Sequence, residues 1–237
     1  MQPMERRPSL SSELTRRLET MIMDGDWKPG DTMPNEIELA REYGLSAGTV
    51  RKALDWMEDV RLISRQQGRG TFVKGPSAED LGLRFNKIRT VDGVPFSIEV
   101  ETLESTEGSA DPAEAEHLAL TVGAPVMHLT RLQTSSGAPL LLETITVSAE
   151  MFPSLRDAHA GYDLAELCLR HGVLIGSGEE RLTMQIADER ICKQLKIAKG
   201  SPVARLERLI RTIDGRPAEW RQAWCNLDGH YYTAELH

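Results

Sequence analysis

Basic side chains gather in two short stretches of the N-terminal third of the chain. Residues 43–54 contain two bases and no acid, and residues 60–75 contain four bases and no acid. The net charge of −8 lies in residues 76–237, because residues 1–75 carry 12 basic and 12 acidic side chains. Lysine and arginine neutralise nucleic-acid phosphates, and arginine also hydrogen-bonds to guanine edges. A domain that is neutral overall can therefore present one basic face to DNA.

The side chains that usually catalyse reactions or bind metals show no productive spacing. None of the six histidines falls in an HxH, HxxxH or HExxH pattern, and Cys168, Cys192 and Cys225 are far apart in the sequence. A zinc site or a disulfide framework is therefore not expected. There is no Gly-x-Ser-x-Gly elbow, Walker loop or GxGxxG after a strand. The sequence predicts no catalytic residue, no metal and no cofactor, and hence a protein that is not an enzyme.

Length and composition predict a soluble protein of two domains. The chain has 237 residues, of which 40% are hydrophobic and 27% are charged, as in ordinary globular proteins. No apolar run approaches the ~20 residues that cross a bilayer, and the N-terminus lacks the apolar segment of a secretory signal. The odd number of scattered cysteines is typical of a reducing compartment. We therefore expect a cytoplasmic protein that does not bind membranes.

The first basic stretch lies where a helix-turn-helix is expected. Apolar residues recur at helical spacing in residues 9–24, and two more helices are expected at residues 35–43 and 46–59. Gly44 ends the second of these helices, and Ser46 is placed to cap the third almost at once. Two helices joined by a tight glycine turn, the second of them basic, are typical of DNA-binding helix-turn-helix domains.

The second basic stretch predicts a wing. Short strands are expected at residues 62–65 and 71–74, around a turn in which glycines flank Arg69. The glycines allow the backbone to approach DNA closely, and an arginine between them can enter a minor groove. The predicted DNA-binding residues are Ser46, Thr49, Arg51, Lys52, Arg65, Gly68, Arg69, Gly70 and Thr71.

The remainder of the chain predicts an α+β domain. Residues 76–82 are small and polar and form the expected linker between a domain at 1–75 and another at 83–237. The second domain has strand-like runs near residues 95–103, 125–134, 139–147, 179–186, 202–214 and 217–226, and helix-like runs near 112–120, 151–157, 162–172 and 187–197. Two hairpins resemble each other, and the second strand of each carries one acidic residue, Glu143 or Glu219. An antiparallel sheet with helices is the expected architecture.

Residues 9–75 resemble the DNA-binding domain of the GntR family of regulators. The matching residues are Leu14, Gly25, Pro29, Gly30, Pro34, Glu36, Leu39, Ala40, the Gly44-Leu45-Ser46 turn, the Thr49–Leu54 run, and Gly68 to Val73. The resemblance implies a winged helix-turn-helix that binds a double-stranded DNA operator. The family pattern usually has arginines where this chain has Ile37 and Ala47. We therefore expect DNA binding, but not to the operator sequence usual in the family.

Residues 83 to 236 resemble the UTRA effector-binding domain of the HutC-type subfamily, whose fold is related to chorismate lyase. The resemblance rests on Arg131, Gly137-x-Pro139, Glu143, Leu164-x-x-Leu167, Gly172, Leu195, Gly200, Pro202, Val203, Arg211, Gly215, Pro217, Ala218, Glu219 and a tyrosine at 231 or 232. It implies a regulator whose DNA affinity changes when a small molecule binds the C-terminal domain. We expect a homodimer that acts as a repressor, although the sequence does not distinguish a repressor from an activator.

The resemblance and a Gly-Ser-Gly stretch at 176–178, which contains Ser177, together suggest a set of effector-binding residues. The expected residues are Arg131, Gln133, Glu143, Ser177, Glu219 and Tyr231. Gln133 stands where the subfamily usually has a second arginine. A neutral amide is less suited than arginine to bidentate binding of phosphate. A small carboxylate, an amine or an amino-acid derivative is therefore as well suited as a sugar phosphate. The expected effector is an anionic or polar metabolite.

Four other interpretations are compatible with the sequence. Glu143 and Glu219 can be solvated partners of cross-strand arginines instead of ligand contacts. The C-terminal domain can dimerise without an effector, or act as a lyase, because a fold does not determine a function. The winged helix can also serve as a protein-interaction module.

Overall fold

The computed structural model describes residues 9–23, 25–74, 85–92, 98–156, 164–212 and 214–234. The chain divides into two compact units, residues 1–80 and 81–237. The expected linker at 76–82 lies outside the described residues. No helix among the described residues is long and apolar enough to cross a membrane.

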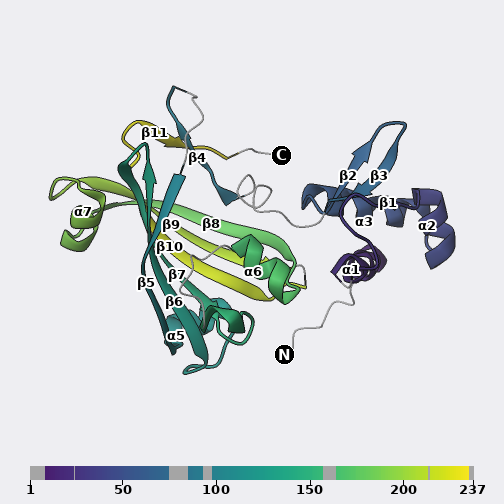
Figure 1. Cartoon of the computed structure of the whole chain (residues 1–237), viewed down its shortest axis with the longest axis horizontal. Coiled ribbons are helices and arrows are strands. Elements are labelled where there is room, and N and C mark those ends of the chain that lie inside the picture. The colour runs from purple at the N-terminus through teal and green to yellow at the C-terminus, as the bar shows by residue number, and fades with distance from the viewer. Residues whose placement is uncertain are drawn as a thin grey trace, which may run out of the picture. The chain divides into compact units, whose positions relative to one another are not determined.

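The N-terminal unit is the predicted winged helix-turn-helix (Figure 1). Its elements are α1 (Leu10–Met23), β1 (Thr32–Met33), α2 (Glu36–Tyr43), α3 (Ala47–Asp59), β2 (Ile63–Gln66) and β3 (Gly70–Val73). The three strands form an antiparallel sheet in the order β1-β3-β2. Leu18, Leu39, Leu54 and Met57 are fully buried between the helices. The sequence did not reveal β1, because two residues are too few to show an alternating pattern.

Local hydrogen bonds fix the turn between α2 and α3. The Asn35 side chain accepts hydrogen bonds from the backbone amides of Ile37 and Glu38, and the Glu38 carboxylate accepts one from the backbone amide of Asn35. This capping box satisfies amides that have no partner within the helix. Gly44 ends α2 at φ 63°, a left-handed conformation that glycine adopts without steric cost. Ser46 then caps α3, as the sequence predicts.

The C-terminal unit is built on a six-stranded antiparallel sheet in the order β5-β6-β7-β10-β9-β8. The strands are β5 (Ile98–Ser109), β6 (Pro125–Ser135), β7 (Ala138–Ser148), β8 (Ile175–Ile186), β9 (Pro202–Thr212) and β10 (Pro217–Cys225). Strands β6 and β7 form one of the two predicted hairpins, and β9 and β10 form the other. The α+β class with an antiparallel sheet is confirmed.

Two helices cover one face of this sheet. They are α5 (Pro112–Leu118) and α7 (Glu189–Leu195), which Figure 1 shows near different ends of the strands. Helix α5 packs with Val126 and Trp220, and α7 packs with Leu132 and Leu142. Side chains alternate along a strand, so the neighbouring residues of these strands project from the other face.

The second face has two apolar areas. One is the cluster of Ile145 and Ile210 with the 3-10 helix η1 (Pro153–Arg156) and with α6 (Leu164–His171). The other lies beneath a small two-stranded sheet of β4 (Ile88–Thr90) and β11 (His230–Tyr232), where Leu141, Leu206 and Ala223 are buried. The sequence did not reveal β4 or β11, because each strand has only three residues and their partners are distant in sequence.

Candidate functional site

The first turns of α3 present a polar surface. The Ser46 hydroxyl accepts a hydrogen bond from the backbone of Thr49 at 3.1 Å and lies 2.9 Å from its hydroxyl. Ser46, Arg51 and Lys52 are exposed, and Thr49 is half-buried. Val50, Ala53, Leu54 and Met57 form the buried side of the helix. The capped end of α3 therefore keeps its backbone fixed while its polar side chains face outward.

Glu36 holds Arg51 in a defined position. The Nε and Nη2 atoms of Arg51 donate hydrogen bonds to Oε2 of Glu36 at 3.0 and 2.8 Å. The hydrogen bond and the negative charge of Glu36 raise the pKa of Arg51, although its side chain is 63% exposed. The start of α2 is thereby tied to the exposed side of α3, and the guanidinium stays charged and accessible.

Arg65 lies in a different environment. Its Nη2 atom is 2.6 Å from Asp55, and its other guanidinium nitrogens approach Glu58 at 3.5 Å and Glu36 at 3.9 Å. The side chain is only 27% exposed. Arg65 thus connects β2 to α2 and α3, a structural role that sequence reasoning did not anticipate for this predicted DNA-binding residue.

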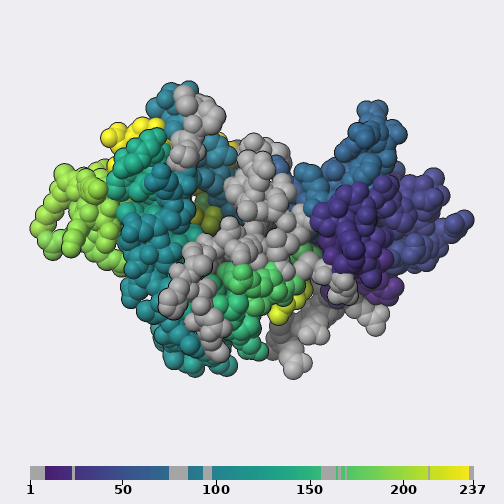
Figure 2. All heavy atoms as spheres, viewed as in Figure 1, coloured from purple at the N-terminus to yellow at the C-terminus, as the bar shows by residue number. Residues whose placement is uncertain are grey.

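The hairpin of β2 and β3 projects from the N-terminal unit as a wing (Figure 2). Gly68 and Gly70 have φ values of 73° and 113°, which L side chains rarely adopt. Arg69 lies exposed between them, and its backbone amide donates to Gln66 within the turn. Thr71 is half-buried and pairs with Met33 of β1. Arg69 is therefore the predicted wing residue that is best placed to meet a groove.

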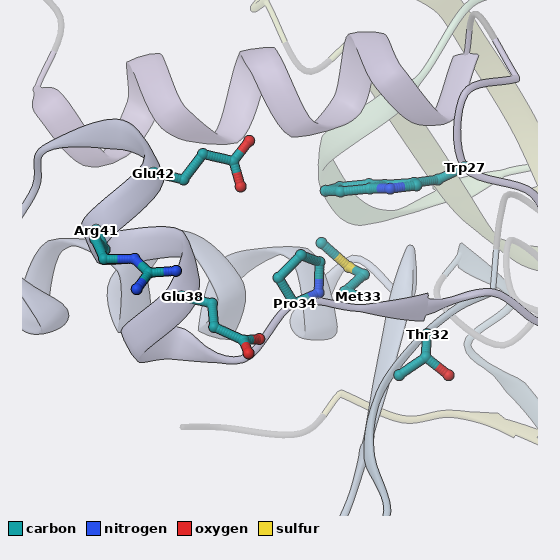
Figure 3. Close-up of a pocket in the computed structure, with 7 residues that line it drawn as sticks. All are labelled: Trp27, Thr32, Met33, Pro34, Glu38, Arg41 and Glu42. Carbon is teal, nitrogen blue, oxygen red and sulfur yellow. The ribbon is translucent and has the colours of Figure 1, made fainter.

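A pocket in the same unit is separate from these residues (Figure 3). It lies between the turn that carries Trp27 and the outer side of α2. The residues that line it are Trp27, Thr32, Met33, Pro34, Glu38, Arg41 and Glu42. None of the predicted DNA-binding residues is among them, and Glu38 is already used in the capping box. The pocket is therefore not part of the predicted DNA-binding surface.

In the C-terminal unit, charged side chains cross the second face of the sheet between its two apolar areas. The register places Arg131 opposite Glu143, Arg221 opposite Arg208, and Arg208 opposite Glu180. These residues, together with Gln133 and Glu219, come from strands β6, β7, β10, β9 and β8. We call this set, with Tyr232, the charged cluster. Arg131 and Tyr232, its first and last members, are more than a hundred positions apart in the sequence.

Glu143 lies at the centre of the charged cluster and is 0% exposed. Its Oε1 atom is 2.5 Å from Nη2 of Arg131 and accepts a hydrogen bond from Gln133 at 3.0 Å. Its Oε2 atom is 3.1 Å from Nη1 of Arg221. Burial by itself would raise the pKa of Glu143, but Arg131, Arg221 and Gln133 together lower it. Glu143 is therefore a buried ionised carboxylate, not the solvated surface partner that the alternative interpretation described.

Glu180 continues the charged cluster toward β11. Its Oε1 atom is 2.9 Å from Nη2 of Arg221, and its Oε2 atom accepts a hydrogen bond from the Tyr232 hydroxyl at 2.8 Å. Burial, followed by the hydrogen bond to Glu180, raises the pKa of Tyr232 to about 12. The phenol is therefore a hydrogen-bond donor at neutral pH.

Arg208 and Arg221 have donors to spare. Arg208 lies 3.5 Å from Glu219 and donates to the Phe85 carbonyl at 2.8 Å. Among the described residues, however, the buried Nε atoms of both arginines have no hydrogen-bond partner. Burial, and then the neighbouring charge of Arg221, lower the pKa of Arg208. Two adjacent buried guanidiniums with unused donors are suited to hold an anionic group.

Four of the six residues expected to bind an effector lie in the charged cluster. These are Arg131, Gln133, Glu143 and Glu219. Ser177 is exposed and is paired with Arg211 in the register, next to a bulge. Tyr231 is 44% exposed, and its neighbour Tyr232 makes the contact with Glu180 instead. Neither Ser177 nor Tyr231 is brought into the cluster.

Sequence reasoning missed Arg208, Arg221 and Glu180, and of the two tyrosines that it named it chose Tyr231 instead of Tyr232. One signal for the two arginines was available in the second predicted hairpin. Side chains alternate between the two faces along each strand, and this places Arg208 and Arg221 on the same face of the sheet. Among the described residues, no group of histidine, cysteine, aspartate or glutamate could hold a metal ion. Burial raises the pKa of the Cys225 thiol to about 12, so this cysteine is not a nucleophile at neutral pH.

Two family models match the chain. Residues 10–73 match "Bacterial regulatory proteins, gntR family", and residues 97–230 match the "UTRA domain". The mannosyl-D-glycerate transport/metabolism system repressor MngR of Escherichia coli is 26% identical over 233 residues, which cover 94% of each chain. The histidine utilization repressor of Pseudomonas putida is 29% identical over 210 residues, covering 86% of this chain and 83% of the other.

Solved structures share the fold. PhnF from Mycobacterium smegmatis has a TM-score of 0.57 at 25% identity, with 94% of this chain and 99% of PhnF covered. YydK from Bacillus subtilis has a TM-score of 0.56 at 17% identity and covers 95% of this chain and 99% of its own, a likeness of fold alone.

Replacing Glu143 by glutamine should destabilise the C-terminal unit. The change leaves Arg131 and Arg221 without their shared counter-charge, and breaking a buried ion pair typically costs about 3–5 kcal/mol of unfolding free energy. Urea denaturation followed by circular dichroism measures this loss, with Glu104→Gln on the exposed strand β5 as the control. Equal loss in both variants would contradict a central role for Glu143.

The difference in stability between wild type and Glu143→Gln should depend on pH. The folded-state pKa of Glu143 is lowered, so its contribution to stability is complete above the ordinary glutamate pKa of about 4.3. That contribution is lost as the pH falls through the lower folded-state value. The stability difference between wild type and Glu143→Gln should therefore be constant near neutral pH and shrink in acid.

Proposed function

The chain belongs to the GntR family of bacterial regulatory proteins and carries a UTRA domain, and we propose that it represses transcription as a homodimer released from its operator by a small carboxylate. It is a DNA-binding transcription regulator with an effector domain, as its relatives are, and not an enzyme. The observation that carries the effector proposal is the buried charged cluster on the second face of the C-terminal sheet.

The exposed end of α3 and the wing support the proposed contacts with DNA. Ser46, Thr49, Arg51 and Lys52 would face the major groove from one helix end. Arg69 would follow from the tip of the wing. Because Glu36 already orders the guanidinium of Arg51, less side-chain entropy is lost when that side chain binds a base.

The charge balance of the cluster supports a particular class of effector. Its three arginines, Arg131, Arg208 and Arg221, are matched in number by Glu143, Glu180 and Glu219. Because the cluster is already neutral, a dianionic phosphate would leave it with two excess negative charges, whereas one carboxylate leaves one and needs only the two arginines that still have free donors. The glutamates and Gln133 would then accept or donate hydrogen bonds to the polar part of the ligand. A small carboxylate or an amino-acid derivative meets these requirements.

The names of two relatives are compatible with this class. One relative regulates histidine utilization and another mannosyl-D-glycerate metabolism, and both histidine and mannosyl-D-glycerate carry a carboxylate. For this chain we propose only the shared chemical class, a carboxylate. The individual compounds are candidates for the test.

The edge strand β8 supports the homodimer. Leu182, Met184 and Ile186 recur at every second position along this strand and are 42%, 61% and 64% exposed. Alternation places the three side chains on one face of β8, which is an edge strand of the six-stranded sheet. The opposite edge strand, β5, carries four glutamates and is a poor surface for self-association. A second copy of the chain is therefore proposed to cover β8.

Removing the Arg51 side chain should weaken DNA binding. Loss of one base contact typically costs ~1–3 kcal/mol, so Arg51→Ala should bind about 5- to 160-fold more weakly to a duplex selected from a random pool. Fluorescence anisotropy at moderate salt measures the affinity. Arg17→Ala removes the same charge from an exposed position on α1 and should have little effect. Equal affinities of the two variants would exclude Arg51 from the interface.

An effector of the proposed class should stabilise the protein through Arg208. A thermal-shift panel of amino acids, their breakdown products, small carboxylates, polyamines and sugar phosphates tests this. A ligand at a hundred times its dissociation constant adds ~2.7 kcal/mol to the unfolding free energy. The shift should disappear in Arg208→Gln and persist in Arg211→Gln, whose side chain follows the opposite alternation on β9. No hit, together with unchanged DNA affinity, would favour a regulator without an effector.

A charge on β8 should break the dimer. Met184→Asp places an unpaired carboxylate in the proposed interface, so sedimentation velocity should show a monomer where the wild type sediments as a dimer. Val100→Asp makes the matched change on β5, where the side chain is 51% exposed, and should leave the dimer intact. A dimer disrupted by the Val100 change alone would place the interface on β5.

A further inference from the structure

Two exposed apolar side chains lie at the beginnings of α2 and α3. Ile37 is the second residue of α2 and is 76% exposed, and Ala47 is the first residue of α3 and is also exposed. Ile37 does not anchor its helix, because Leu39 is the buried residue of α2. Among the described residues of the N-terminal unit, the only other large exposed hydrophobic side chain is Leu10, at the start of α1.

Both apolar side chains lie beside basic ones. Ala47 and Arg51 are four residues apart in α3 and therefore lie on the same side of the helix. Arg51 donates two hydrogen bonds to Oε2 of Glu36, and Ile37 directly follows Glu36. Arg65 of β2 also approaches Glu36, at 3.9 Å. The two apolar groups thus lie within the surface whose arginines would attract phosphates.

The chemistry of the major groove restricts what such apolar groups can recognise. Base edges there present hydrogen-bond donors and acceptors, with one apolar exception, the C5-methyl group of thymine. Isoleucine and alanine cannot satisfy the polar edges of guanine or cytosine, and leaving a polar edge unpaired costs free energy. Against a methyl group, the same side chains gain from the removal of apolar surface from water.

We propose that Ile37 and Ala47 contact thymine methyl groups and so select thymines at the operator positions that they face. The inference rests on the proposed DNA binding and adds a specificity that Arg51 does not provide. Arg51 would read or position the DNA through hydrogen bonds, while the two apolar side chains would favour thymine by shape and hydrophobicity.

Uracil substitution tests the inference directly. Uracil pairs like thymine but lacks the C5-methyl group, so one duplex for each thymine of a selected site is made with uracil at that position. Fluorescence anisotropy with the full-length protein measures the affinity for each duplex. At the contacted thymines, uracil should weaken binding roughly fourfold, the ratio that corresponds to ~0.8 kcal/mol for one buried carbon group.

Protein variants connect each methyl group to its partner. In Ile37→Ala, one uracil position that weakens wild-type binding should have no further effect, and Ala47→Gly should do the same at another position. Leu10→Ala removes a comparable exposed side chain from α1 and should keep the full uracil profile. Circular dichroism verifies that each variant keeps its helices.

The outcomes separate this inference from the proposed function. Loss of methyl sensitivity in the two variants, but not in Leu10→Ala, supports it. A wild type that binds its selected duplex but is indifferent to uracil everywhere, or variants that keep the full uracil profile, would overturn it while the proposed function stands. Failure to bind any duplex from the pool would overturn the proposed function itself, and the inference with it.

Discussion

The burial of Glu143 constrains the whole C-terminal unit. A carboxylate that is completely removed from water must be balanced by opposite charge and hydrogen bonds, because its desolvation costs several kcal/mol. Arg131 provides this from β6 and Arg221 from β10, and Gln133 adds a hydrogen bond. A slip of one residue in either strand would turn the arginine to the opposite face of the sheet. The charged cluster therefore fixes the register of the central strands, in addition to its proposed role as a ligand site.

The N-terminal unit depends on one carboxylate in a comparable way, but at the surface. Glu36 accepts hydrogen bonds from Arg51 and lies near Arg65, so the start of α2, the exposed side of α3 and the base of the wing meet at one acidic side chain. This explains how a domain with equal numbers of acids and bases can present ordered basic groups. Glu36, Asp55 and Glu58 lie against Arg51 or Arg65 and position them, and the wing arginine, Arg69, remains exposed at the tip.

Features with local causes could be predicted from the sequence, and features that depend on distant pairing could not. Asn35, Gly44 and Ser46 define helix ends within three or four residues, so α2 and α3 were predicted almost to the residue. Arg208 and Arg221 were missed because their proximity to Glu143 depends on how β7, β10 and β9 are paired. The choice between Tyr231 and Tyr232 depends on which face of the three-residue strand β11 turns inward, and so short a strand has no readable alternation.

Gln133 has a consequence for how this fold can change over evolutionary time. Substituting any charged member of the cluster removes the counter-charge of a buried partner, so such a change must be accompanied by a second one. Gln133 contacts Glu143 through a neutral amide, and its loss leaves no buried ion uncompensated. A lineage can therefore alter this position in a single step, while the central ion pairs keep the sheet intact.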